Sequence, residues 1–254
     1  MTKRQWIKPT ESLNELEQSI CEFLDITSPQ DTPQLSVNFR HSPIPEAEYN
    51  AKIAWCKRVE QLASKQKLKE FQLDRLKEAI PHILSHAERE EDVASVPQLL
   101  MDLGVHFIIV KHLNKTYLDG AAFYFRNHPV VALTLRHNRI DYFWFSLMQE
   151  LGYIIAGHQG IYLNNLEDLE ANPEEEKANK LARNWLIDEK ALNSFIVNTQ
   201  PKFSKKAIAN FAHEQNKHPG IILGRLQHEG LVPYSNLRML LVKVKPFLSE
   251  WIYD

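Results

Sequence analysis

The chain has 254 residues, of which 44% are hydrophobic and 24% charged, and its formal net charge is −2. This length allows one large domain or two smaller ones with a sizeable core. The near balance of charge gives no global electrostatic reason to expect binding to nucleic acid or to an anionic membrane.

No apolar run reaches the roughly 18 residues of a membrane-spanning helix, and the polar start MTKRQWIKP forms no signal-peptide core. We therefore expect a cytoplasmic protein that does not associate with membranes. The two cysteines, Cys21 and Cys56, match neither a metal-ligand spacing nor a disulfide framework. Both are expected to be small buried apolar residues.

The first part of the chain, residues 1–95, is expected to form a helical region. Apolar residues recur there at helical spacing, and a proline-rich stretch interrupts the pattern after the first helix. Pro81 is expected to bend its helix or to end it early. A short apolar helix then ends at Gly104. Helices are predicted over 12–24, 46–64, 70–88 and 96–103.

The hydrophobic period then changes to that of strands. Three short runs, VHFIIV, AAFYFR and VVALTL, are rich in β-branched and aromatic residues and are separated by the turn residues Asp119-Gly120 and Asn127 to Pro129. We expect about three strands, at 105–110, 121–126 and 130–135. They are predicted to form a small antiparallel sheet with one face packed on helices, which gives an α+β fold.

Helices return after the strands. Asp141 is expected to N-cap a long apolar helix that reaches about Ala156, with Gly157 as its stop. Pro173, followed by three glutamates, predicts the start of a further helix that continues to about Leu192. Two short helices, over 204–215 and 221–229, surround a tight turn.

The long apolar helix contains the segment QELGY, residues 149–153, which looks like the zinc motif H-E-x-x-H with both histidines replaced. In that motif the residues at i and i+4 share one helix face and hold Zn²⁺, while the glutamate acts as general base. Here the positions hold Gln149, Glu150 and Tyr153. Taken alone, the pattern favours a core helix with a hydrogen-bonded glutamate over a zinc site.

The surrounding motifs raise the weight of the zinc-peptidase interpretation. The runs GVHFIIV, YLDGAAFYF and PVVALTL, then RIDYFWFSLMQELGYIIAGH and EEEKANKLARNWLI, resemble the ImmA/IrrE metallopeptidase family. The closest resemblance is to the C-terminal region of HigA-type antitoxin regulators, and it extends from about Trp6 to Trp251. It implies a zincin-like domain over 96–200, preceded by the helical region 1–95 and followed by a helix-turn-helix-like subdomain over 201–254.

Carried over by position, the resemblance places Gln149 and Tyr153 at the two histidine-ligand positions and Glu150 at the general-base position. Glu175 matches the acidic third ligand, with Glu176 as a second candidate. A neutral amide is a poor zinc ligand, and a tyrosine coordinates well only after losing a proton of pKa about 10.

The resemblance therefore implies a vestigial site in which Gln149, Tyr153 and Glu175 hydrogen-bond to one another. His158 is a further candidate for the lining of that site. No cofactor is expected, and zinc belongs only to the alternative in which Glu150 serves an active metallopeptidase with unorthodox ligands.

The leading functional hypothesis is a catalytically inactive scaffold in a bacterial or phage toxin–antitoxin, stress-regulation or defence setting. Its partner would be a protein: a toxin, a regulator or a separate DNA-binding subunit. In the antitoxin-like relatives a DNA-binding helix-turn-helix precedes the region of Trp6, whereas Met1 lies almost at that junction here. A second alternative is a DNA-associated regulator whose weak or indirect nucleic-acid contact uses Lys205, Lys206, Lys217 and Arg225.

Overall fold

The computed structural model describes every residue except 32, 34, 36–45, 115, 158–161 and 165–172. It has an α+β fold, in which helices pack on a sheet with the strand order β4-β2-β3-β1-β5. The α-helices are α1 (Leu13–Leu24), α2 (Glu46–Ala63), α3 (Leu73–Ser85), α4 (Val96–Asp102), α5 (Ile140–Ile155), α6 (Pro173–Leu186), α7 (Glu189–Thr199), α8 (Lys205–Glu214) and α9 (Pro219–His228). The strands are β1 (His106–Val110), β2 (Gly120–Phe125), β3 (His128–Leu133), β4 (Tyr162–Asn164) and β5 (Ile252–Tyr253).

The sheet is mixed, so the predicted antiparallel arrangement is wrong for its first strand. β2 and β3 form an antiparallel hairpin, whereas β1 pairs in parallel with β3 and with β5. The hairpin is forced by its two-residue turn, because Arg126 and Asn127 both have positive φ, at 48° and 68°. The connection between β1 and β2, residues 111–119, is longer, so these two strands need not be neighbours in the sheet. β3 therefore lies between β1 and β2.

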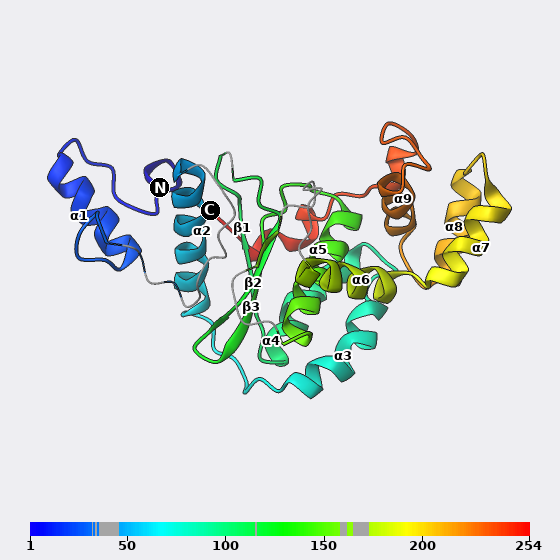
Figure 1. Cartoon of the computed structure of the whole chain (residues 1–254), viewed down its shortest axis with the longest axis horizontal. Helices are drawn as coiled ribbons and strands as arrows, with labels where there is room; N and C mark the ends of the chain where they lie inside the picture. Colours follow the sequence, from blue (N-terminus) through cyan, green and yellow to red (C-terminus); the bar gives the residue numbers. More distant parts are fainter. Residues whose placement is uncertain (32, 34, 36–45, 115, 158–161, 165–172) are drawn as a thin grey trace.

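Helices cover both faces of the sheet, and not one face as predicted. Phe107 and Ile109 of β1 belong to the core on the α5 side, whereas Ile108 and Val110 belong to the core on the α2 side. Figure 1 shows α2 on one side of the strands and α5 on the other. Because successive side chains of a strand point to opposite faces, two covered faces require continuous apolar runs such as VHFIIV.

The layer on the α2 side is anchored by Trp55, which is fully buried. Its indole Nε1 donates a hydrogen bond of 3.0 Å to the carbonyl oxygen of Val110 on β1. Cys21 and Cys56 are free and buried, as expected, and burial raises the pKa of the Cys56 thiol. Neither cysteine therefore has the exposure of a reactive one.

Helix α5 is the central element of the other layer, and nearly all its side chains are buried. Its N-cap residue is Arg139, which precedes the first helical residue, so the predicted N-cap at Asp141 is wrong by two positions. The free amide of Ile140 donates to the carbonyl oxygen of Val242 at 2.9 Å, so a distant part of the chain caps the helix. The end agrees with expectation, because Gly157 follows the last turn with φ +72°.

Two helices that pack in the same core as α5 differ in length from the prediction. Pro81 lies inside α3, which continues to Ser85 and is therefore not ended early. The helix predicted to extend to Leu192 is divided into α6 and α7. Asp188 starts the second of these, since its carboxylate accepts a hydrogen bond of 2.7 Å from the amide of Ala191.

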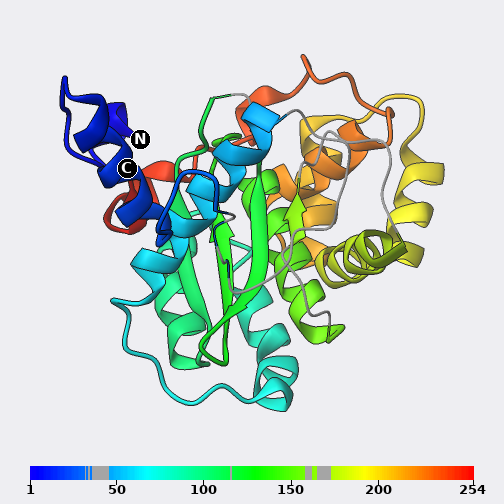
Figure 2. The same cartoon turned by 60° about the vertical axis from the view of Figure 1, so that its left-hand side comes forward.

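Figure 2 shows α8 and α9 on the same side of the sheet as α5 and α6, while the C-terminal strand returns to the far edge next to β1. None of the helices in the described part of the chain combines the length and apolar character needed to cross a bilayer.

One buried histidine of the sheet leads to a pH-dependent stability. His106 is 5% exposed, and its Nδ1 lies 3.0 Å from Gln66 Oε1, an acceptor, so Nδ1 carries a proton. Burial, helped by the charge of His128, lowers the pKa of His106 from 6.5 to about 4. Between these values the unfolded chain binds a proton that the folded chain does not. We expect the free energy of unfolding to fall by about 2–3 kcal/mol as pH drops through this window.

Urea denaturation of the wild type and of His106→Gln at pH 7 and pH 4.5 measures this contribution. The variant should lose that part of the pH dependence, while its amide can still hydrogen-bond to Gln66. An identical pH dependence in the two proteins would rule out His106 as the titrating group.

Candidate functional site

The candidate site lies where α5 and α6 come close together. A Cβ added to Gly152 would lie 3.2 Å from the carbonyl oxygen of Ala178, a tight contact, so the glycine favours this close approach. One turn earlier on α5, the Nε2 of Gln149 donates a hydrogen bond of 2.5 Å to Asn179 Oδ1. Gln149 is only 1% exposed. The first ligand position of the presumed zinc motif therefore does face α6, as the motif requires.

Glu150 points to a different neighbour. It is fully buried, and a Cβ added to Gly120 at the start of β2 would overlap with its Oε1. Adjacent helical residues point about 100° apart, so Gln149 faces α6 while Glu150 faces the sheet. The carboxylate at the predicted general-base position thus depends on a glycine in the neighbouring strand.

These residues do not form a set of donors suited to zinc. Gln149 offers an amide whose nitrogen is already bonded to Asn179, and Tyr153, which is 1% exposed, offers a phenol. Zinc sites in proteins use thiolates, imidazoles and carboxylates. Within the described ranges, no three His, Cys, Asp or Glu side chains gather as a metal-binding group.

The remaining predicted residues are placed as follows. Glu175 lies in the wall of a cavity that it shares with Gln149 and Asn179. Glu176 accepts an ion pair from Arg183 on the same helix. His158 lies outside the described residues. The predicted hydrogen bonds among Gln149, Tyr153 and Glu175 stay a prediction, and the amide nitrogen of Gln149 donates to Asn179.

The cavity has a volume of about 330 Å³ and lies between α5, α6 and α9. Its walls combine aromatic and aliphatic side chains with three arginines, one histidine and three acidic residues. The residues are Arg139, Asp141, Tyr142, Phe145, Gln149, Glu175, Glu176, Asn179, Arg183, Leu186, Ile187, Ile221, Gly224, Arg225, His228 and Tyr234. This volume falls in the range of small-molecule sites, about 300–1,000 Å³.

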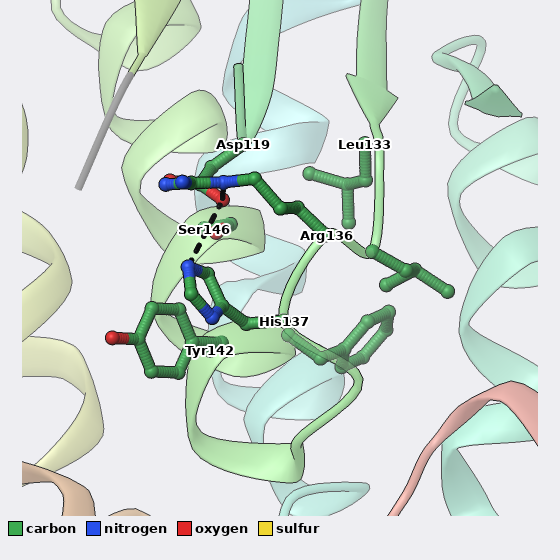
Figure 3. Close-up of a pocket in the computed structure, with 8 residues that line it drawn as sticks. Asp119, Leu133, Arg136, His137, Tyr142 and Ser146 are labelled. Carbon is green, nitrogen blue, oxygen red and sulfur yellow. Dashed lines mark hydrogen bonds and ion pairs between the residues drawn. The ribbon is translucent and has the colours of Figure 1, made fainter. Parts of the chain in front are cut away.

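A polar cluster that the sequence analysis missed lies on the other side of Tyr142. Figure 3 shows Arg136 and His137 converging on Asp119, with Ser146 of α5 alongside. Arg136 donates from Nε and Nη2 to the two carboxylate oxygens of Asp119, at 3.0 and 2.8 Å. The enclosed hollow is about 10 Å³, room for one water molecule at most. We interpret the cluster as a structural clamp, for which the only sequence signal was a turn at Asp119.

The C-terminal helix pair is packed against this core. A Cβ added to Gly224 of α9 would overlap with the carboxylate of Asp141 on α5, so the two helices touch closely. Arg225 pairs with Glu229. The Nζ of Lys217 donates to two backbone carbonyl oxygens at 3.4 and 3.3 Å. The close approach of Gly224 to Asp141 shows that α9 packs on α5, while Lys205 and Lys206 are exposed, so nucleic-acid contact by the pair stays a prediction.

No protein-family model matches the chain, and the comparison with curated proteins finds no similar sequence. The resemblance to the ImmA/IrrE family therefore rests on the residues of the sequence motifs and on their order along the chain.

Proposed function

We propose that the chain is a zincin-like scaffold without peptidase activity that acts as a regulatory binding module. The zincin-like domain would correspond to residues 96–200, and the setting would be bacterial or phage toxin–antitoxin, stress or defence regulation. Both the domain and the setting come from the resemblance to the ImmA/IrrE family. A protein partner is part of the proposal: a toxin, another regulator or a separate DNA-binding subunit.

The observation that carries the proposal is the hydrogen bond between Gln149 and Asn179. At the place where a peptidase of this type would present an imidazole, the chain presents a neutral amide whose nitrogen donates to its neighbour. The oxygen of such an amide is a poor zinc ligand compared with an imidazole nitrogen. Together with a phenol at Tyr153, this leaves too few anionic or imidazole ligands to hold zinc or to lower the pKa of a bound water to about 7.

Melting experiments test the proposal. If the fold requires no metal, dialysis against a chelator should leave the melting temperature unchanged, and added zinc should not raise it. A ligand that binds only the folded state raises the melting temperature by an amount that grows with its concentration, so a resident metal would be visible. The Glu175→Ala variant serves as the matched control, and neither the chelator nor zinc should change its melting temperature.

A drop of several degrees after chelation, reversed by zinc and absent in Glu175→Ala, would favour the alternative. The chain would then be a metallopeptidase that uses Glu150 with an unorthodox ligand set.

A further inference from the structure

The cavity between α5, α6 and α9 contains a buried hydrogen-bond acceptor that lacks a donor. The amide nitrogen of Gln149 is used by Asn179, but its Oε1 is buried and has no hydrogen-bond partner among the described residues. Buried acceptors are almost always satisfied in folded proteins. Because Gln149 lines the cavity, a ligand that carries an N–H or O–H group would complete this hydrogen bond.

Two arginines of the cavity wall have guanidinium groups available to a ligand. Arg225 holds Glu229 through Nε alone, at 2.6 Å, and Arg183 holds Glu176 through Nη2. Their other guanidinium nitrogens have no partner among the described residues. Arg139 differs, because two nitrogens bind Asp141 and one of these also reaches Gln227. The two Nη atoms of Arg225 form an edge that suits the planar, bidentate geometry of a carboxylate, whereas Arg183 can add single hydrogen bonds from its remaining nitrogens.

Arg183 lies on the same face of α6 as the residue that holds Gln149. Arg183 follows Asn179 by four residues on α6, so it lies about one helical turn, roughly 5.4 Å, from the residue that holds Gln149. A carboxylate and the amide N–H next to it can span such a distance. The cavity contains as many arginines as acidic residues, three of each, which favours a single carboxylate over a multiply charged anion. Phe145, Ile187 and Ile221 provide an apolar surface beside them.

We propose that this cavity binds a ligand that ends in a carboxylate, carries a secondary amide next to it and bears an apolar side chain. The C-terminal residue of a peptide and an N-acylated amino acid share this chemistry. Arg225 and Arg183 hold the carboxylate, Gln149 accepts from the amide N–H, and the apolar wall packs on the side chain. The inference rests on the proposed function, since it uses Gln149 as an amide and not as a metal ligand.

Calorimetric titration with four related compounds tests the proposal on the full chain. N-acetyl-leucine has all three features. N-acetyl-leucinamide lacks the carboxylate and 4-methylpentanoate lacks the amide, while leucinamide lacks the carboxylate and also replaces the acyl amide by an ammonium group. We expect N-acetyl-leucine to bind about 10- to 100-fold more tightly than each of the other three, because each lacks at least one charge-assisted or buried hydrogen bond. Arg225→Met and Gln149→Met should each weaken its binding by about tenfold or more, whereas Lys190→Met, on the exposed side of α7, should not.

A peptide with the sequence acetyl-Ala-Ala-Ala-Leu separates the two sources of ligand. Tighter binding of the peptide than of N-acetyl-leucine identifies a peptide C-terminus, and weaker binding identifies an N-acylated amino acid. The proposal is overturned if N-acetyl-leucinamide or leucinamide binds as well as N-acetyl-leucine, if Arg225→Met binds normally, or if no compound binds at millimolar concentration. Zinc in the native protein would contradict the proposed function instead, and the melting experiment detects it separately.

Discussion

The double substitution Gln149→His and Tyr153→His is expected to give a protein that binds about one equivalent of zinc. The two imidazoles would lie one turn apart on one face of α5. That face is directed at α6, as the contact between Gln149 and Asn179 establishes. Glu175, in the wall of the same cavity as Gln149, would supply the carboxylate. Glu150 would stand next to the first imidazole in the chain.

Zinc stoichiometry and melting temperature of the double variant measure this effect. Histidine is smaller than tyrosine, so the Tyr153 change leaves a small void that costs roughly 1 kcal/mol. Bound zinc should outweigh this cost, and the melting temperature should rise with zinc concentration. Addition of Glu175→Ala should weaken zinc uptake. Peptidase activity is not required, because a cleft no longer selected for cleavage need not fit a substrate. A correctly folded double variant without zinc would make the motif resemblance superficial.

The second large effect is expected at the polar clamp. Asp119→Ala should destabilise the protein by about 3–5 kcal/mol, because it leaves the Arg136 charge in a largely buried place without its partner. The side chains of Asp119 and Arg136 are only 4% and 13% exposed. The clamp also joins the loop before β2 to the loop that precedes α5, so its loss should loosen the strand end beside Glu150.

Urea denaturation of the variant and of two controls tests the clamp. The double change Asp119→Ala and Arg136→Met removes both charges and should recover much of the lost stability. Asp74→Ala breaks an ion pair with Lys77 in which Asp74 is 88% exposed, and should change stability little. If Asp119→Ala is as stable as Asp74→Ala, the cluster does not act as a clamp.

The elements of the fold could be predicted because their signals are local. The helical period of α5, its stop at Gly157 and the strand runs of β1 to β3 all lie within short windows. The pairing of β1 with β3 could not be predicted, since it depends on which strand edge the hairpin leaves open. The start of α5 was misplaced for a similar reason. Its cap is the carbonyl oxygen of Val242, about a hundred residues away in the chain.

In the candidate site, too, the local features could be predicted and the contacts between distant segments could not. The motif correctly indicated that residue 149 faces a following helix, because helix periodicity fixes the face. It did not indicate that Asn179 is the partner, since the offset between α5 and α6 is set by the approach of Gly152 to Ala178. Asp119 and Arg136 were separated by a strand hairpin, and Asp119 gave only a turn signal. Their ion pair arises from the hairpin, which brings the two strand ends together.

Metal analysis of the native protein, purified without a histidine tag, tests the central claim most directly. If Gln149 and Tyr153 have replaced the zinc ligands, the protein should contain well under one equivalent of zinc, and Glu175→Ala should contain no less. Near-stoichiometric zinc that disappears in Glu175→Ala would contradict the account. It would show instead that the chain holds its metal with an unorthodox set of ligands.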